Sequence, residues 1–288
     1  MNVNSLFLNF LLGISYGCIL FLLGAGLSIT MGLMRIVNLA HGALYMVGAY
    51  VGLSVAKLTG NFLLGVLAGG VCAALIGLLM EIGFLRKLYR REMDQVLLTI
   101  GFVYILTNLT QWIWGPMPLS GVIPSFLSGS IPMGRVSFPL FRLAIIFFGL
   151  VAAVVLWLFQ EKTRVGSIIR AGMDNKEMTM GLGINLSIVF TGVFAIGAFV
   201  AGFCGLIGAP SLGINLAVGW EALLLGMVVV IVGGTGSIQG ALVGGVIIGL
   251  ADAYGKAFFP ELAHFSIYIV LIIILLFRPS GLMGRKMN

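Results

Sequence analysis

The sequence predicts an all-α integral membrane protein: a polytopic bundle of about eight to nine transmembrane helices with two interrupted or short helical segments. Of its 288 residues, 60% are hydrophobic and 9% are charged, whereas soluble globular domains carry about 25% charged residues. So few charges cannot cover a water-exposed surface. Glycine contributes 42 residues, roughly twice its average usage, and glycine lets membrane helices approach closely. We therefore expect residues 1–288 to form one membrane domain.

Apolar stretches follow one another along most of the chain. A bilayer core about 30 Å thick needs about 20 helical residues, whereas about twelve residues make only about 18 Å of helix. The stretches expected to cross the membrane are residues 6–30, 61–85, 96–114, 142–159, 187–209 and 262–277. Three shorter stretches are residues 43–56, 221–232 and 241–254. The count of eight or nine depends on how the pieces near Gly42 and Gly233 are drawn.

Positive charges set the expected orientation. Eleven of the 16 Lys and Arg residues fall in residues 86–95, in residues 160–186 and after Phe277. Cytoplasmic loops of membrane proteins carry such an excess, and the spans between these segments are even in number. We therefore expect these segments and the carboxyl terminus in the cytoplasm. The amino terminus and the proline-rich residues 115–139 are expected outside.

The short stretches point to a permeation path. Irregular backbone at membrane depth is tolerated only where protein or a water-filled cavity satisfies its polar groups. Interrupted segments in both halves of a transporter are a sequence pointer to its binding site. Here one interruption precedes HGALYMVG (41–48) and the other precedes QGALVGG (239–245). The alternative is that these glycines serve only tight helix packing.

Ionisable residues within apolar spans default to functional candidates. They are Arg35, His41, Glu81, Glu221 and Asp252. We interpret Glu81 as an interface residue, Glu221 as a carboxylate at the positive end of a helix, and Asp252 as lying near the outer mouth. The group formed by Arg35, Asn38 and His41 suggests a cavity or gate; its alternative is snorkelling to the interface.

Residues 160–186, hereafter the polar segment, hold seven charges between two apolar spans. We expect one or two short helices here. Met173, Met178 and Met180 lie beside charged residues, and methionine-rich faces suit a groove on a partner protein. The alternative is a solvated loop.

Enzymatic and nucleic-acid functions find little support. The sequence has two histidines, no metal-binding or nucleophile motif, and no P-loop, so ATP would have to bind to another chain. Cys18, Cys72 and Cys204 sit singly in apolar spans and are expected to be small buried hydrophobes. The net charge of +7 follows from the cytoplasmic loops, and we predict no metal, cofactor or nucleic acid on this chain.

Three stretches taken together resemble one family. They are VNLAHGALYMVGAY (37–50), RAGMDNKEMTMGLGIN (170–185) with AIGAFVAGFCGLIGA (195–209), and VGGTGSIQGALVGGVIIGLAD (232–252) with FRPSGLMGR (277–285). In this order the chain is similar to permease subunits of ABC importers for hydrophobic, branched-chain amino acids, of the LivH-like type. The EAA consensus of other ABC importers is not present.

The resemblance implies an inner-membrane permease domain of a bacterial cell and a set of partners. These are a second, LivM-like permease subunit, two cytoplasmic ABC ATPase subunits and an extracytoplasmic substrate-binding protein. It implies that the polar segment couples to an ATPase through Arg164, Gly166, Arg170, Ala171, Asp174, Met178, Gly181 and Gly183. It implies a path or gate formed by Asn38, His41, Gly42, Tyr45, Gly233, Gly234, Gly236 and Ser237.

Two other functions stay open at this point. The paired interruptions also suit a stand-alone channel or secondary carrier for a small neutral solute. Within the resembled family, some members carry urea or short-chain amides. A membrane-embedded enzyme lacks a convincing catalytic motif.

Overall fold

A computed structural model describes residues 3–34, 37–89, 91–133 and 136–284 of the chain. Seven of its described helices are long and apolar enough to cross a membrane. They are α1 (Val3–Met34), α2 (His41–Thr59), α3 (Phe62–Gly83), α4 (Glu92–Trp114), α5 (Leu140–Lys162), α8 (Leu186–Leu212) and α10 (Ile238–Phe258). Two shorter apolar helices are α9 (Val218–Gly233) and α11 (Ala263–Phe277). The predicted all-α class and the count of spans are confirmed.

The expected short span at residues 241–254 is wrong, because α10 has 21 residues. The Ser237 side chain caps its first turn by accepting a hydrogen bond from the Gly240 N–H at 2.9 Å. At its other end the helix continues through Asp252 and Lys256, which pair at 2.6 Å. Helix α2 likewise reaches 19 residues. Helix α9, with 16 residues, is short as expected for residues 221–232, whereas α11, expected to cross the membrane at residues 262–277, has only 15.

The proline-rich connection contains a small hairpin that the sequence did not suggest. Strands β1 (Ser130–Met133) and β2 (Val136–Pro139) pair antiparallel, after the short 3-10 helix η2 (Ser125–Leu127). Phe138 is fully buried. Earlier in this connection, the Leu119 N–H donates to the Ile214 carbonyl at 2.8 Å, on the segment that joins α8 to α9. This end of the bundle is therefore covered by ordered backbone.

Glycines allow the central helices to pack backbone against backbone. Helices α1 and α10 run antiparallel, and a Cβ atom added to Gly17 would lie 2.8 Å from the Gly245 carbonyl oxygen. Helices α3 and α8 meet in the same way, since a Cβ atom at Gly202 would lie 2.5 Å from the Gly69 oxygen. These contacts confirm that glycine serves close helix packing. They place the buried core around α1, α2 and α8.

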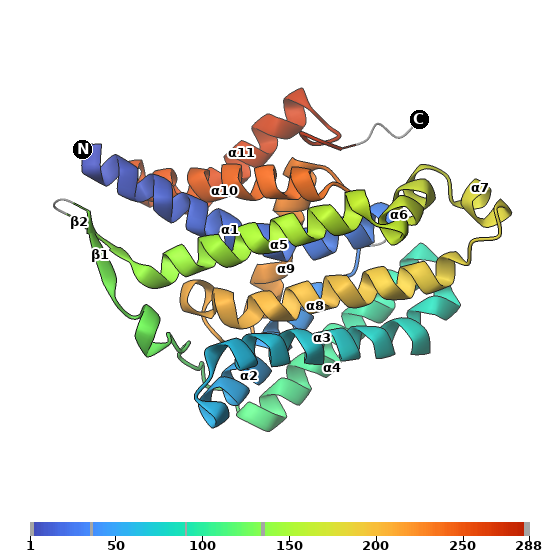
Figure 1. The fold of residues 1–288 in the computed structure, drawn as a ribbon, viewed down its shortest axis with the longest axis horizontal. Coiled ribbons are helices and arrows are strands. Elements are labelled where there is room, and N and C mark those ends of the chain that lie inside the picture. The colour runs from blue at the N-terminus through green and yellow to red at the C-terminus, as the bar shows by residue number, and fades with distance from the viewer. Residues whose placement is uncertain (1–2, 35–36, 90, 134–135, 285–288) are drawn as a thin grey trace.

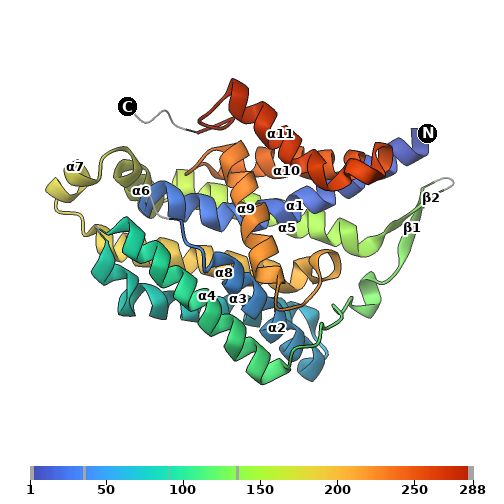
Figure 2. The ribbon, with the colours of Figure 1, turned by 180° about the vertical axis from the view of Figure 1, so that it is seen from behind.

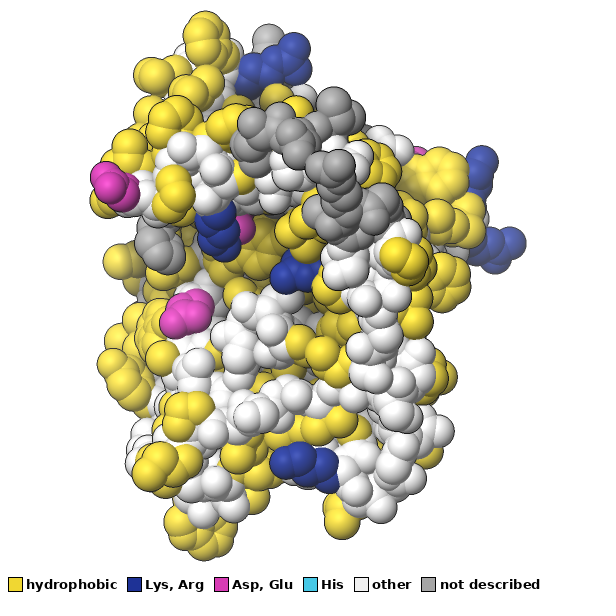
Figure 3. Space-filling view, turned by 90° about the vertical axis from the view of Figure 1, so that its left-hand side faces the viewer, with side chains coloured by type: hydrophobic (Ala, Val, Ile, Leu, Met, Phe, Trp, Pro, Cys, Tyr) yellow, Lys and Arg dark blue, Asp and Glu magenta, His cyan; other side chains and the backbone are white. Residues whose placement is uncertain are grey.

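The bundle has two chemically different ends. Helices α6 (Arg164–Asp174) and α7 (Lys176–Gly181) project at one end, with the carboxyl terminus (Figure 1). The basic 3-10 helix η1 (Leu85–Leu88) joins α3 to α4 at this same end. The amino terminus and the hairpin lie at the opposite end. Seen on that opposite face, side chains of both charge signs are scattered among hydrophobic ones (Figure 3).

Helix α9 departs from the general direction of the bundle. Figure 2 shows it lying across α1 and α5. It starts beside α2, where a Cβ atom on Gly42 would overlap the Gly219 carbonyl. It passes α1 at Gly24, whose added Cβ would meet the Val229 side chain at 2.7 Å. It ends beside the start of α10. A short, crossing helix thus connects the two interrupted regions.

Candidate functional site

Capping side chains start each helix in and after the polar segment, namely α6, α7 and α8 (Leu186–Leu212). The Thr163 hydroxyl accepts a hydrogen bond from the Gly166 N–H at 3.0 Å and starts α6. Asn175 starts α7 by accepting from the Met178 N–H at 2.9 Å. Asn185 does the same for α8 through the Ser187 N–H at 3.1 Å. Such caps satisfy N–H groups that helix starts leave unpaired. The prediction of one or two short helices is confirmed, and the solvated-loop alternative is not.

The predicted coupling residues divide into an outer and an inner group. The outer group is exposed at the surface and comprises Arg164, Ala171, Asp174, Met178, Gly181 and Gly183. Gly183 has a φ of 81°, which ends this stretch with a left-handed turn. Gly166 is buried at the joint between α5 and α6, where any side chain would overlap the Gln160 carbonyl. Arg170 is also turned inward.

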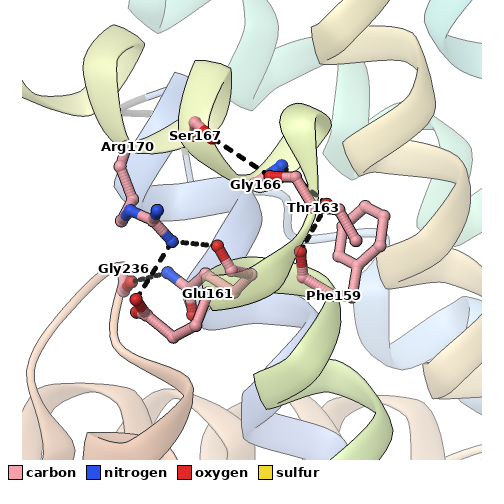
Figure 4. A network of polar contacts seen from close by, with 8 residues as sticks. Phe159, Glu161, Thr163, Gly166, Ser167, Arg170 and Gly236 are labelled. Atoms are coloured by element: carbon pink, nitrogen blue, oxygen red, sulfur yellow. Dashed lines mark hydrogen bonds and ion pairs between the residues drawn. The ribbon is translucent and has the colours of Figure 1, made fainter.

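Arg170 ties α6 to the end of α5 (Figure 4). Its guanidinium donates a hydrogen bond to the Gln160 carbonyl and lies 3.2 Å from the Glu161 carboxylate. Its side chain is 24% exposed, so the contact is shielded from most of the water. Hydrogen bonds that involve a charged group are among the stronger ones in proteins. Arg170 therefore positions the helix that carries the exposed residues.

Residues 234–237, hereafter the glycine break, separate α9 from α10. Gly234 has a φ of 98° and Gly236 a φ of 80°, which are angles that favour glycine. The Gly236 N–H donates to the Ser28 carbonyl at 3.0 Å and to the Ser28 hydroxyl at 3.1 Å. The irregular backbone is thus satisfied by α1, as a break at membrane depth requires.

Residues 282–284, hereafter the carboxyl-terminal segment, cover the side of the glycine break that faces away from α1. The Leu282 N–H donates to the Val232 carbonyl at 2.8 Å, and the Met283 N–H donates to the Gly233 carbonyl at 2.9 Å. A Cβ atom at Gly234 would overlap the Gly284 backbone. Gly233 and Gly234 are therefore buried, while Ser237 acts as the cap of α10. These predicted path residues are packed in this conformation.

The second predicted path group lies at the start of α2. The Asn38 side chain accepts from the Ala40 N–H at 3.1 Å, and its carbonyl accepts from the His41 N–H at 3.2 Å. The His41 Nε2 atom lies 3.1 Å from the Leu23 carbonyl, so Nε2 carries the proton. Asn38, His41 and Tyr45 are 5%, 2% and 0% exposed. Arg35 lies outside the described residues.

A small cavity adjoins Asn38. It is lined by Thr30, Met34, Asn38, Leu85, Gln95, Thr99 and Phe194. The Gln95 side-chain oxygen is buried and has no hydrogen-bond partner among the described residues. The cavity has room for about one water molecule. The cavity lies between Asn38, just before α2, and Leu85 of the basic helix η1.

The two path groups lie at different depths along α1. His41 contacts the carbonyl of Leu23, whereas the glycine break contacts Ser28. Five residues separate these two positions, which corresponds to about 7.5 Å of helix. The structure thus brings the polar segment and the glycine break together. At the start of α2, His41 bonds to Leu23, more than one turn from Ser28 along α1, whereas Asn38 lines a cavity with Thr30 and Met34.

Three contacting residues were not among the predicted site residues. Gln160 donates from its side chain to the Gly236 carbonyl at 2.9 Å. Met173 packs on the break, because a Cβ atom at Gly236 would lie 2.7 Å from its sulfur. Lys176 donates to the Met34 carbonyl at 3.1 Å. Met173 was recognised for its residue type, but no sequence signal linked it to the glycines.

Of the remaining ionisable candidates, Glu81 and Asp252 have structural partners. Glu81 is fully buried and accepts hydrogen bonds from Tyr89 and, at 2.5 Å, from Thr191. Burial, and then the hydrogen bond to Glu81, raise the pKa of Tyr89 above its ordinary value, so its phenol stays a donor. Glu221 lies in the first turn of α9, as predicted, and Asp252 pairs with Lys256.

The described part of the chain shows no candidate metal site. No group of three or more His, Cys, Asp or Glu residues is placed to hold a metal ion there. Cys18 and Cys204 are buried, and Cys72 is partly buried. All three are free thiols, as their positions in apolar spans led us to expect.

Comparison with known proteins decides the family. The family described as "Branched-chain amino acid transport system / permease component" matches residues 9–275. The chain belongs to this permease family. Its nine apolar helices among the described residues agree with a membrane permease. Membership favours a permease of a transport system over a stand-alone channel or carrier.

Individual relatives cover almost the whole chain of this permease. The branched-chain amino acid permease LivH of Escherichia coli K12 is 29% identical over 95% of this chain and 94% of its own. BraD of Pseudomonas aeruginosa is 28% identical with the same coverage. A LivH described as probable, from Methanocaldococcus jannaschii, is 29% identical over 94% of this chain and 90% of its own. No solved structure shows a significant match.

Proposed function

We propose that this permease works in an ABC importer of branched-chain or other hydrophobic amino acids. The proposed assembly contains a second related permease, two ATPase subunits and an extracytoplasmic binding protein. Family membership and the similarity to LivH and BraD, which are branched-chain amino acid permeases, support the substrate class. ATP would bind to the ATPase subunits, since this sequence has no P-loop.

One observation supports the proposed coupling role. The polar segment is exposed at Met178 and Leu182, hereafter its tip, and is held to the bundle near Arg170, hereafter its root. At the tip, Met178 is 71% exposed and Leu182 is 76% exposed. They lie in or directly after α7, which projects from the end of the bundle (Figure 1), within a segment that carries seven charges. Exposed apolar residues rimmed by polar ones mark protein interaction sites. At the root, Arg170 holds α6 to α5.

We assign the tip to an ATPase groove and the charged end to the cytoplasm. Arg164, Ala171, Asp174, Met178, Gly181 and Gly183 are then at or near the ATPase contact, while Gly166 and Arg170 keep α6 in place. The excess of Lys and Arg at this end supports the orientation.

We infer that the glycine break and the start of α2 belong to the translocation path. The break is closed here by the carboxyl-terminal segment on one side and by α1 and α6 on the other. Opening would separate surfaces that only glycine allows to meet. Asn38, His41 and Tyr45, with the neighbouring cavity, would form a second constriction.

The experiment is reconstitution with the partners that co-purify from the native membrane. Mild-detergent affinity purification and mass spectrometry identify them. Proteoliposomes of the complex are then tested for ATP-dependent uptake of labelled leucine, isoleucine and valine, with urea and acetamide as competing substrates. We expect amino acid uptake that stops without ATP. Uptake by this chain alone, or without nucleotide, would refute the proposal.

Orientation has a separate test in sealed membrane vesicles. Glu177→Cys in α7 and Ser128→Cys beside the hairpin lie at opposite ends and are both exposed. A membrane-impermeant thiol reagent should reach Ser128→Cys from outside the cell and Glu177→Cys only after permeabilisation. The reverse pattern would overturn the assigned orientation.

A further inference from the structure

The side chain and the backbone of Gln160 bind two different parts of the molecule. Gln160 lies in the last turns of α5 and is 7% exposed. Its side-chain Nε2 donates to the Gly236 carbonyl at 2.9 Å. Its backbone carbonyl accepts from the Arg170 guanidinium of α6. Gln160, the first residue of the polar segment, therefore contacts both α6 and the glycine break directly.

The Gly236 peptide is held from two directions. Its carbonyl accepts from Gln160 on α5, while its N–H donates to Ser28 on α1. The Gly236 φ of 80° lies in the left-handed region, which glycine adopts readily and other residues rarely do. A displacement of α5 and α6 relative to α1 must therefore either carry the Gly236 peptide along or break the Gln160 hydrogen bond.

A second contact runs parallel to the first. The Met173 sulfur of α6 packs where Gly32 of α1 meets Gly236, since Cβ atoms added to Gly32 and Gly236 would lie 2.9 Å and 2.7 Å from it. This thioether is flexible and makes no directional bond. It can fill the space through a movement, whereas the Gln160 amide fixes a direction. The directional part of the connection is thus the glutamine.

We propose that Gln160 is the positioning residue that transmits movement of the polar segment to the glycine break. This inference rests on the proposed importer function and names the contact through which its coupling passes. ATPase closure would pull α6, Arg170 would carry the end of α5 with it, and the Gln160 amide would turn the Gly236 peptide. Physical connection through elements with two arrangements is what such coupling requires.

Two substitutions remove the donor and keep the size of the side chain. Gln160→Leu has no polar group, and Gln160→Glu is nearly isosteric but places an acceptor against the Gly236 carbonyl. In proteoliposomes of the complex, we expect ATP hydrolysis to continue while uptake falls, so that ATP consumed per amino acid rises about tenfold. Gln111→Leu, at an exposed position in α4, should keep the wild-type ratio.

If Gln160 had only a structural role, its substitution would lower ATP hydrolysis and amino acid uptake together. A wild-type value of ATP consumed per amino acid in both variants would overturn the proposal. If Gln160→Leu does not assemble, Gln160→Glu gives the measurement. Failure of the importer function itself looks different, because then the unmutated complex shows no ATP-dependent uptake.

Movement of the break has its own readout. Thr235 is exposed within the break; the native Cys18 and Cys204 are buried, and the partly buried Cys72 is replaced by serine in every variant of this assay. In a Thr235→Cys complex, a non-hydrolysable ATP analogue should change the rate of thiol labelling at least about fivefold. Adding Gln160→Leu should abolish that change. Equal changes with and without Gln160 would overturn the proposed transmission.

Discussion

Lys176 of α7 donates a hydrogen bond from its Nζ atom to the carbonyl of Met34, the last residue of α1, at 3.1 Å. The final carbonyls of a helix lack intrahelical partners and carry partial negative charge. The same ammonium group lies 5.5 Å from the centre of the Phe190 ring on α8. One side chain of the polar segment thus joins the ends of two long helices.

Replacing Lys176 by methionine should weaken that junction. The substitution keeps an unbranched apolar stem but removes the charge at the end of α1. We expect a loss of about 1 kcal/mol in the free energy of unfolding, seen as a decrease of about 2–4 °C in Tm. Thermal unfolding in detergent measures it. Lys87→Met, at an exposed position in η1, is the control and should leave Tm nearly unchanged.

Reversing the charge of Arg170 should loosen α6 before it affects any docking surface. Arg170→Glu places a carboxylate beside Glu161 and the Gln160 carbonyl. We expect a loss of about 1–3 kcal/mol in stability together with reduced uptake. Thermal unfolding and proteoliposome transport give the two values.

Two further variants separate the causes of the Arg170→Glu effect. Arg170→Lys keeps a cation, so it should lose less stability. Glu161→Gln, added to Arg170→Glu, removes the repulsion between carboxylates and should recover part of the loss. Full stability of Arg170→Glu alone would show that the network of Figure 4 contributes nothing.

Charges introduced at the tip of the polar segment should act on the partner instead. Met178→Glu and Leu182→Glu change exposed side chains, so the fold should be unaffected. If these side chains enter an ATPase groove, co-purified ATPase should decrease about tenfold or more, the size of an interface hot spot. Quantitative mass spectrometry of the purified complex measures the ratio.

The matched control for the tip is Leu58→Glu. Leu58 is 86% exposed and lies near the end of α2, away from the polar segment. Its substitution should leave the ATPase ratio at the wild-type value. Equal losses for the tip and for Leu58 would contradict an ATPase contact specific to α7.

Gly234→Ala should lower uptake by more than the strain of its positive φ alone would cause, because the added methyl group also has no space. Gly60 and Gly234 both have positive φ, at 68° and 98°. A Cβ at Gly60 meets nothing within 4 Å, whereas one at Gly234 would overlap the Gly284 backbone. We expect Gly60→Ala to cost about 1–2 kcal/mol and to retain uptake. Gly234→Ala should lose most uptake, and Gly234→Leu all of it.

The comparison of these two alanine variants is the informative measurement. Both pay a backbone cost, so a difference in transport reports the packing of the break. Similar uptake rates in Gly60→Ala and Gly234→Ala would refute the assignment of Gly234 to the path. Thermal unfolding of both variants accompanies the transport assay.

The order and number of helices could be predicted because each apolar span is long and ends in polar residues. Their limits were harder, since α10 contains Asp252 and Lys256, which a hydropathy reading takes as an end. In the folded chain these two residues pair with each other, and Lys256 lies 5.5 Å from the Tyr16 ring centre. Tertiary contacts thus extended the helix beyond its apolar part.

The sequence could predict which segments form the candidate site, but not which of their residues contact one another. Charge density revealed the polar segment, and paired glycines revealed the break. The link between them depends on Gln160 and Met173, from the consecutive helices α5 and α6, and on Ser28 of α1, which is far from both in sequence. None of these residue types is unusual for its position. The hairpin had no clear sequence signal, since proline is disfavoured in strands and both β1 and β2 contain one, Pro132 and Pro139.

The hydrogen bonds from Leu282 and Met283 to Val232 and Gly233 have a consequence for biogenesis. The acceptors are translated 50 positions before their donors. These two carbonyls at the end of α9 therefore gain their partners only after α10 and α11 have been synthesised. Completing the turn between α9 and α10 thus waits for the segment that follows α11.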